Sequence, residues 1–427
     1  MLIVSELKRN LEKAVKGLQK RGIEDAEKVL NQIISLDDDR KRIQGELDNV
    51  LSQSNKAAKE IGKLIGQGKK EEAEKAKEET SRLKSASKDL AQKMTDIEKE
   101  LQNALYNVPN IPNEIVPAGK SDEDNEVVKD FEIEGLPKLV DGAKPHWDLV
   151  SEYDIIDFEL GNKVSGSGFP FYKGQGARLS RALINYFLDE GIKKGYQEIQ
   201  PPIVINEDSG YGTGQLPDKE GQMYGINDTN LYLIPTAEVP ITNIYRGEIL
   251  DESRLPVKNI GFTPCFRREA GSWGAHVRGL NRLHQFDKVE IVCISKIEES
   301  YDLLEEMKSH VENLLKSLEL PYRILRLCAG DLGFTSAITY DFEVYSMAQK
   351  KWLEVSSVSN FENYQSNRLR LRYKTGDKKK VLAHTLNGSA LALPRIIAAI
   401  LENNQQDNSI RIPEVLRRYC GFEEITK

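Results

Sequence analysis

The first 105 residues contain no phenylalanine, tyrosine, tryptophan, proline, histidine or cysteine. A segment without aromatic residues is a poor candidate for a conventional core, and without proline only its glycines would interrupt a helix. Its charges nearly balance, with 22 lysines and arginines against 20 aspartates and glutamates. This segment is therefore expected to form long, highly charged helices that bury a narrow apolar stripe.

Apolar residues in this segment recur in alternating steps of three and four, which is the spacing of a coiled-coil seam. One seam runs from Leu36 to Leu64, and a second resumes after Gly66-Gln67-Gly68. Two seams separated by a glycine-containing tip predict an antiparallel helical hairpin over about residues 27–105, with its tip near 66–70. At about 1.5 Å per residue, such helices would give an arm of roughly 55–60 Å.

Composition divides the chain into three expected parts. Residues 1–106 form the helical arm, with a shorter helix at about 5–20. Residues 107–145, rich in proline, glycine and acidic residues, form a connector with a short strand at most. From residue 146 to 427, aromatic residues, prolines and alternating strands predict an α+β domain, an antiparallel sheet flanked by helices. Its longest helices are expected at 175–194, 297–318 and 390–403.

Length and composition exclude several classes of protein. The chain has 427 residues, which predicts two or three domains, and no run approaches the roughly 18 apolar residues of a membrane span. Charge follows the apolar start of the chain at once, unlike a secretory signal. The four cysteines are far apart, which argues against disulfides and structural zinc and favours a reduced, cytoplasmic location. The net charge of −7 argues against a generally basic nucleic-acid binder.

The arm allows two interpretations from its residues alone. Coiled coils commonly form dimers, so a dimerisation element is the simpler one. Alternatively, the arm could contact an extended partner, because lysines that could bind phosphate lie at its tip and along one approach. These lysines are Lys56, Lys59, Lys63, Lys69 and Lys70.

Residues 262–292 carry the clearest chemical pattern in the C-terminal domain. They are expected to form a strand, a long polar loop with glycines and a returning strand. Arg267 and Glu269 are two apart and Phe286 and Glu290 four apart, so on extended strands each pair would share a face. Such a hairpin could bind a nucleotide and an amino acid, because arginine pairs with phosphate or carboxylate and phenylalanine offers a stacking surface. A surface ladder of ion pairs is the alternative.

Several segments, in order, resemble the motifs of one enzyme family. The hairpin is similar to motif 2 of class II aminoacyl-tRNA synthetases, GYQEIQPPIV to motif 1, and LNGSALALPR at 386–395 to motif 3. The segments YGTGQLP (211–217), LIPTAEVPITN (233–243) and LEVSSVSNFENYQSNR (353–368) resemble seryl-tRNA synthetases of the bacterial type. The resemblance spans essentially the whole chain, because that family also carries an N-terminal antiparallel coiled-coil arm.

The resemblance implies a role for each matching residue. Serine would be bound by Thr236, Ala237, Glu238, Arg267, Glu290, Asn387 and Ser389, with Glu290 reading the ammonium and the hydroxyl. ATP would be bound by Arg267, Arg268, Glu269, Leu283, Phe286, Glu354, Val355, Ser356, Ser357 and Arg395. Catalysis would depend on Arg267, Glu269 and Arg395, and Glu354 with Ser357 would ligate a magnesium ion.

The same resemblance implies ATP-dependent attachment of L-serine to tRNA(Ser), through seryl-adenylate and transfer to the tRNA 3′ end. The resemblance also implies attachment of serine to tRNA(Sec) in a cell that contains that tRNA. It also implies a homodimer formed through motif 1, an arm that contacts the long variable arm of tRNA(Ser), Mg²⁺ with ATP, and no structural zinc. The chemistry agrees with the residues, because joining a carboxylate to a phosphate requires cations that screen both anions.

A few positions depart from the family pattern. Trp273, Ala275 and His276 lie in the motif 2 loop, where relatives are more basic, so contacts with the tRNA acceptor end are not assigned to this loop. Gly168 stands where an arginine is often seen, and His284 is interpreted as structural. Two other functions are considered: a synthetase paralogue that loads a protein carrier, which would lack the arm, and a non-catalytic binding protein, which would not need the charged residues.

Overall fold

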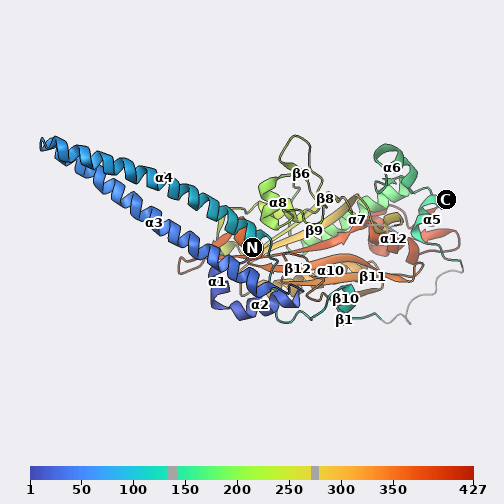
Figure 1. The fold of residues 1–427 in the computed structure, drawn as a ribbon. Helices are drawn as coiled ribbons and strands as arrows, with labels where there is room; N and C mark the ends of the chain where they lie inside the picture. Colours follow the sequence, from blue (N-terminus) through green and yellow to red (C-terminus); the bar gives the residue numbers. More distant parts are fainter. Residues whose placement is uncertain (132–141, 271–277) are drawn as a thin grey trace. The chain divides into compact units, whose positions relative to one another are not determined.

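The computed structural model describes residues 1–131, 142–270 and 278–427 of the chain (Figure 1). It divides into two compact units. The first comprises Met1–Gln19 and Ile23–Pro109, and the second comprises Lys20–Gly22 and Asn110–Lys427. Residues Trp273, Ala275 and His276 lie outside the described residues.

The first unit is a helical hairpin built from α3 (Ala26–Gly66) and α4 (Lys70–Tyr106), which pack along each other in antiparallel directions (Figure 1). The antiparallel arm predicted from the heptads is confirmed. Seam residues such as Leu36, Ile43 and Leu64 are buried, whereas Ser35, Arg42 and Ile65 beside them are exposed. At the tip, Gly68 has a φ of +76°, a backbone conformation that glycine adopts without strain.

Two short helices precede the hairpin where one was expected at about residues 5–20. They are α1 (Val4–Arg9) and α2 (Leu11–Lys20). The break falls at Asn10, whose φ of −130° and ψ of +39° are not helical. The prediction of a single helix is therefore wrong, because apolar spacing continues across a residue that ends one helix before the next begins.

The second unit is built on an eight-stranded sheet. Its strand order is β1 (Glu126–Lys129), β10 (Tyr322–Arg326), β11 (Ile338–Ser346), β12 (Lys351–Glu362), β15 (His384–Ala392), β9 (Gln285–Ser295), β8 (Val257–Phe266) and β4 (Gln197–Glu198). All neighbours are antiparallel except β4 and β8, which are parallel. The predicted α+β class with an antiparallel sheet is confirmed, and β1 shows that part of the segment between 107 and 145 joins the sheet edge.

Three helices pack on one face of this sheet (Figure 1): α7 (Gly174–Lys193), α10 (Ser300–Ser317) and α12 (Leu393–Asn403). The helix α12 begins later than residue 390 because β15 continues to Ala392. Strand β9 contributes side chains to both faces of the sheet. Val289, Ile291 and Cys293 join the apolar core with these helices, so the alternating residues Lys288 and Glu290 point to the other face.

Smaller elements complete the unit. Its other helices are α5 (His146–Glu152), α6 (Phe158–Ser165), α8 (Glu207–Thr213), α9 (Glu238–Asn243), α11 (Tyr364–Leu369) and α13 (Glu414–Cys420), with 3₁₀ turns at Asp122–Asp124, Glu252–Arg254 and Gly279–Asn281. Its other strands are β2 (Ile156–Asp157), β3 (Phe171–Tyr172), β5 (Val204–Asn206), β6 (Leu231–Leu233), β7 (Ile249–Asp251), β13 (Arg372–Lys374), β14 (Lys380–Leu382), β16 (Ser409–Arg411) and β17 (Glu424–Thr426). Within the described ranges, none of the helices is long and apolar enough to span a membrane.

Candidate active site

A cavity of about 690 Å³ opens over the face of the sheet that α7, α10 and α12 leave uncovered. Strands β9, β12 and β15 contribute its floor, and the segment before α9 contributes one wall. Most of the expected site residues line it: Thr236, Glu238, Arg267, Glu269, Leu283, Phe286, Glu290, Glu354, Val355, Ser356, Ser357, Asn387, Ser389 and Arg395. Ala237 and Arg268 are not among the described residues that line the cavity.

The sequence suggested that Arg267 and Glu269 lie on a strand, and this prediction is wrong. The strand β8 ends at Phe266, and Glu269 has a φ of +50°. Both side chains still face the cavity because backbone contacts fix the chain after β8. The Arg267 amide donates to the His284 carbonyl at 2.9 Å, and the Glu269 amide donates to the Gln222 side-chain oxygen at 3.1 Å.

Glu290 lies at the floor of the cavity and is 1 % exposed. Its two carboxylate oxygens are held by three neighbours. Asn387 Nδ2 donates to Oε1 at 2.9 Å, while Lys288 Nζ lies 2.6 Å and Ser389 Oγ 3.4 Å from Oε2. A buried carboxylate held in this way is fixed in place, and its charge is paired with the Lys288 ammonium.

Glu238 provides a second carboxylate at the same end of the cavity. Burial and the nearby charge of Glu290 raise the pKa of Glu238 to about 7. A hydrogen bond of 2.7 Å from the Gln365 amide to Oε1 opposes this rise in the pKa. Two carboxylates that crowd each other in a buried pocket form a site that favours an ammonium group.

Two arginines lie farther along the cavity wall. The Arg267 guanidinium is 5.2 Å from the centre of the Phe286 ring, and its Nε donates to the Pro235 carbonyl at 3.3 Å. Arg395 is held by main-chain oxygens, since Nε donates to Asn281 at 2.9 Å and an Nη donates to Glu354 at 2.6 Å. The cavity therefore joins an anionic end to a cationic end beside an aromatic ring.

The pair Glu354 and Ser357 provides oxygen atoms near this cationic end. Ser357 Oγ donates to Glu354 Oε1 at 3.3 Å. Beside them, burial and the charge of Glu354 raise the pKa of Asp341 well above its ordinary value, and its Oδ1 has no hydrogen-bond partner among the described residues. Crowded oxygen ligands of this kind suit a hard divalent cation such as Mg²⁺. No group of three or more histidines, cysteines or acidic residues that could hold a metal occurs within the described residues.

His284 does not line the cavity among the described residues, which agrees with a structural role. Its ring stacks on Phe169 with centroids 5.4 Å apart, and its Nδ1 lies 2.8 Å from the Tyr224 hydroxyl. The glycine at position 168 is also explained. Gly168 has a φ of +85°, and a Cβ there would come within 2.4 Å of the His284 ring.

Three residues near the expected site were not identified from the sequence. Lys288 contacts Glu290, Gln365 contacts Glu238, and Arg282 pairs with Glu269 at 2.9 Å. Lys288 could have been found, because it lies two residues before Glu290 on the same strand and so shares its face. Gln365 lies on the short helix α11 and Arg282 lies in a loop. Neither segment is long enough for a periodic pattern to predict where its side chains point.

Comparison with known proteins identifies the family of the chain. Residues 1–112 match the family described as seryl-tRNA synthetase N-terminal domain, and residues 224–404 match the tRNA synthetase class II core domain (G, H, P, S and T). The chain is 46 % identical over 427 residues to the serine–tRNA ligase of Salinibacter ruber, covering 100 % of this chain and 99 % of that protein. The chain belongs to the seryl-tRNA synthetase family. The serine–tRNA ligase of Clostridium tetani is 43 % identical over 436 residues, with complete coverage of both chains.

Solved structures agree with this membership. The seryl-tRNA synthetase of Pyrococcus horikoshii, solved with ATP, superposes with a TM-score of 0.90 at 35 % identity and covers 100 % of this chain and 99 % of that chain. A prolyl-tRNA synthetase of Giardia lamblia has a TM-score of 0.56 at 16 % identity over 64 % of this chain and 56 % of that chain, which shows the shared fold alone. The resemblance deduced from the motifs is therefore confirmed at the level of the family and of the class II synthetase fold.

Proposed function

We propose that this protein is a serine–tRNA ligase that uses ATP to attach L-serine to tRNA(Ser). The observation that carries the proposal is the buried carboxylate of Glu290, held by Asn387, Ser389 and Lys288 in the cavity that also presents Arg267 and Arg395. Membership of the seryl-tRNA synthetase family supports it.

The anionic end of the cavity suits serine. Glu238 and Glu290 would receive the ammonium group, and the Ser389 and Asn387 side chains offer hydrogen bonds near Glu290 for the hydroxyl. A site built to hydrogen-bond a hydroxyl rejects an alanine strongly, because its buried polar groups are then left without a partner. Thr236 and Ala237 belong to the backbone segment that places Glu238.

The cationic end suits the reaction centre of adenylate formation. In the first step the serine carboxylate oxygen attacks the α-phosphorus of ATP, the bond to the β-phosphate oxygen breaks, and pyrophosphate leaves. Arg267 would contact both the carboxylate and the α-phosphate, and Arg395 the outer phosphates, so that the anions approach without mutual repulsion. Phe286 would stack on the adenine, with Glu269, Arg268 and Leu283 around it.

Glu354 and Ser357 would hold the magnesium ion that accompanies ATP, and Val355 and Ser356 between them would contact ATP itself. Bound there, Mg²⁺ would neutralise phosphate charge and fix the orientation of the triphosphate. The unpartnered oxygen of the buried Asp341, next to Glu354, supports a divalent cation at this place.

In the second step the 3′-terminal ribose hydroxyl of tRNA attacks the seryl carbonyl, and AMP leaves. We further propose that the hairpin of α3 and α4 contacts the long variable arm of tRNA(Ser), that the enzyme acts as a homodimer through motif 1, and that tRNA(Sec) is a second substrate where it exists. Lys69 and Lys70 at the exposed tip are suited to phosphate contacts.

Serine-dependent exchange of pyrophosphate into ATP, followed by charging of tRNA(Ser) transcripts, tests the proposal. Exchange with serine but not with alanine or threonine is the expected result. Exchange followed by transfer to a carrier protein but not to tRNA would identify a carrier-loading paralogue. Binding of ATP without any exchange would identify a non-catalytic protein on the same fold.

A further inference from the structure

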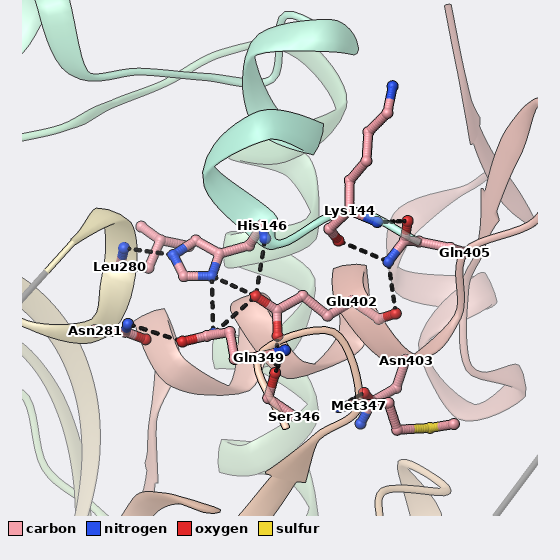
Figure 2. A network of polar contacts seen from close by, with 10 residues as sticks. All are labelled: Lys144, His146, Leu280, Asn281, Ser346, Met347, Gln349, Glu402, Asn403 and Gln405. Atoms are coloured by element: carbon pink, nitrogen blue, oxygen red, sulfur yellow. Dashed lines mark hydrogen bonds and ion pairs between the residues drawn. The ribbon is translucent and has the colours of Figure 1, made fainter. Parts of the chain in front are cut away.

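A buried histidine and a buried glutamate connect α5, α12 and the 3₁₀ turn at Gly279–Asn281 (Figure 2). His146 at the start of α5 and Glu402 near the end of α12 are both 0 % exposed. His146 Nδ1 lies 2.7 Å from Glu402 Oε1, and the His146 amide donates to the same oxygen at 2.8 Å. On the opposite side of the ring, the Leu280 amide donates to His146 Nε2 at 2.8 Å.

These contacts fix the protonation of the imidazole. A backbone amide can only donate, so Nε2 must carry a lone pair, and the ring proton must sit on Nδ1, directed at Glu402. Although burial opposes ionisation, hydrogen bonds from His146 and Ser346 hold the pKa of Glu402 below its ordinary value. The ring therefore links the buried carboxylate of Glu402 to the main chain at Leu280 through a hydrogen bond on each side.

Glu402 is also joined to the turn between β11 and β12. Ser346 donates to its Oε2, and Gln349 Nε2 donates to its Oε1 at 2.8 Å (Figure 2). The Gln349 side-chain oxygen in turn accepts a hydrogen bond of 3.1 Å from Asn281 Nδ2. Two separate paths therefore run from Glu402 to the 3₁₀ turn at Gly279–Asn281.

This turn contacts the cationic end of the cavity. The Asn281 carbonyl accepts the hydrogen bond from Arg395 Nε, and the next residue, Arg282, pairs with Glu269. Among the described residues that line the cavity, Asn281, Arg282 and Arg395 are present and His146 is not. His146 therefore reaches a ligand only indirectly, through the turn or through α12, which carries both Glu402 and Arg395.

The approach of the turn to the imidazole requires glycine at position 279. Gly279 has a φ of +68°, and a Cβ on it would lie 2.2 Å from His146 Nε2. A side chain there would push Leu280 away from the ring. The positive φ of Gly279 and the hydrogen bond from the Leu280 amide both bring the main chain close to the His146 ring.

We propose that His146 is a positioning residue for ATP, which holds the 3₁₀ turn at Gly279–Asn281 and thereby sets the place of Arg395 and Arg282. This inference rests on the proposed function, in which Arg395 meets the phosphates. His146 itself touches no substrate. Its loss should therefore weaken the interaction with ATP while leaving the serine pocket, on the other side of the cavity, unchanged.

Two substitutions separate the contacts of the ring. In His146→Asn the amide can still donate to Glu402, but it is too short to accept from Leu280. In His146→Gln the longer side chain can place its carbonyl near the position of Nε2 and accept from Leu280. His384→Asn is the matched control. His384 is also buried and hydrogen-bonded, with Nδ1 2.8 Å from Ser300 Oγ, but no hydrogen bond within the described residues joins it to the turn.

The variants are made in the full-length protein, and KM for ATP and for serine are measured by pyrophosphate exchange. His146→Asn should raise KM for ATP on the order of tenfold, as expected when a buried donor loses its acceptor. KM for serine should change less than about twofold, and His146→Gln should recover most of the ATP affinity. His384→Asn should lower the melting temperature without changing either KM.

The positioning role is overturned if His146→Asn keeps the wild-type KM for ATP, if both KM values rise together, or if the Gln and Asn variants are equally impaired. Should His146→Asn fail to fold, Gly279→Ala serves instead, because it displaces Leu280 while keeping the imidazole. Calorimetric measurement of ATP affinity on the same proteins keeps the two proposals distinguishable. Wild-type protein that binds ATP but shows no serine-dependent exchange would refute the proposed function, and the ATP affinities of the variants would still test His146.

Discussion

Replacing Glu290 by glutamine removes its charge while keeping the size of the side chain, and this gives the sharpest test of the serine pocket. Glu290→Gln keeps one acceptor oxygen beside Asn387 or Ser389, but it removes the second acceptor and the charge that pairs with Lys288 and would pair with an ammonium group. We expect KM for serine in pyrophosphate exchange to rise by at least about 10²-fold, since losing a buried charge partner costs roughly 3 kcal/mol or more. The exposed Glu248→Gln is the control. A near-normal KM in Glu290→Gln would remove Glu290 from the pocket.

Arg267 tests whether geometry or charge matters at the reaction centre. Arg267→Lys keeps the positive charge but replaces the planar fork with a single point charge, which cannot contact a carboxylate and a phosphate in parallel. We expect a fall in kcat/KM of about 10²-fold, the usual cost of removing one preorganised donor at a developing anion. Wild-type exchange by the Lys variant would show that the fork is not used.

The raised pKa of Glu238 predicts how serine binding depends on pH. Because burial and Glu290 raise its pKa to about 7, the carboxyl is protonated below that pH and ionised above it. The ammonium group of serine stays protonated over this range, so it loses an anionic partner in the pocket as the pH falls. We expect KM for serine to rise roughly tenfold between pH 8 and pH 6. Glu238→Gln should show a high KM that no longer varies with pH, and an unchanged slope in that variant would assign the titration to another group.

At the residue scale, what the sequence could predict depended on the spacing along one element. Phe286 and Glu290 share a face because strand residues alternate, and the cavity contains both. The same reasoning placed Arg267 and Glu269 on a strand that ends before them. His146 and Glu402 are 256 residues apart, and only the folded chain brings their side chains together. The motif resemblance supplied the remaining candidates, and their roles stay predictions until the variants are measured.

At the scale of elements, the arm was the most predictable part because its stability depends on a one-dimensional pattern. At the seam positions Ile43, Ala57 and Leu64 the side chains are less exposed than those beside them, whereas Leu36 is followed by Asp37, which is also buried. The seam is less complete toward the tip, where Leu64 is 8 % exposed, than near the start of α3, where Leu30 is 0 % exposed. The sheet order was less predictable, because pairing of β10 with β1 or of β15 with β9 joins segments far apart in sequence.

Leu64 and Ile65 form an adjacent pair that tests the seam at the tip. Leu64 is 8 % exposed and Ile65 is 58 % exposed, so only the first contributes buried apolar area. Leu64→Ala should destabilise the tip by about 2 kcal/mol, at the low end for a buried leucine, and Ile65→Ala by much less. Amide hydrogen exchange of residues 60–75 measures the difference, because local opening is faster when packing is lost. Equal exchange in both variants would mean that the tip is not held by this seam.

At the scale of the whole molecule, the two units divide the proposed reaction between them. Every candidate residue for adenylate formation lies beyond position 235, in the second unit, whereas the first unit is a charged hairpin with a narrow seam. A hairpin of this kind presents lysines at Lys56, Lys63 and Lys69 without the aromatic side chains that stack on single-stranded bases. Contacts with the backbone of a helical RNA are therefore its expected mode of binding.

Replacing residues 36–100 with a short Gly/Ser loop tests this division directly. Serine-dependent pyrophosphate exchange should stay near the full-length value, because that step uses only residues of the second unit. Charging of tRNA(Ser) should fall steeply, and the tRNA affinity of the intact enzyme should decrease as salt rises, since phosphate contacts release counterions. The oligomeric state of the truncated protein, measured by light scattering, separates the two interpretations of the arm. A truncated protein that turns monomeric yet charges tRNA(Ser) at the full rate would make the arm a dimerisation coil.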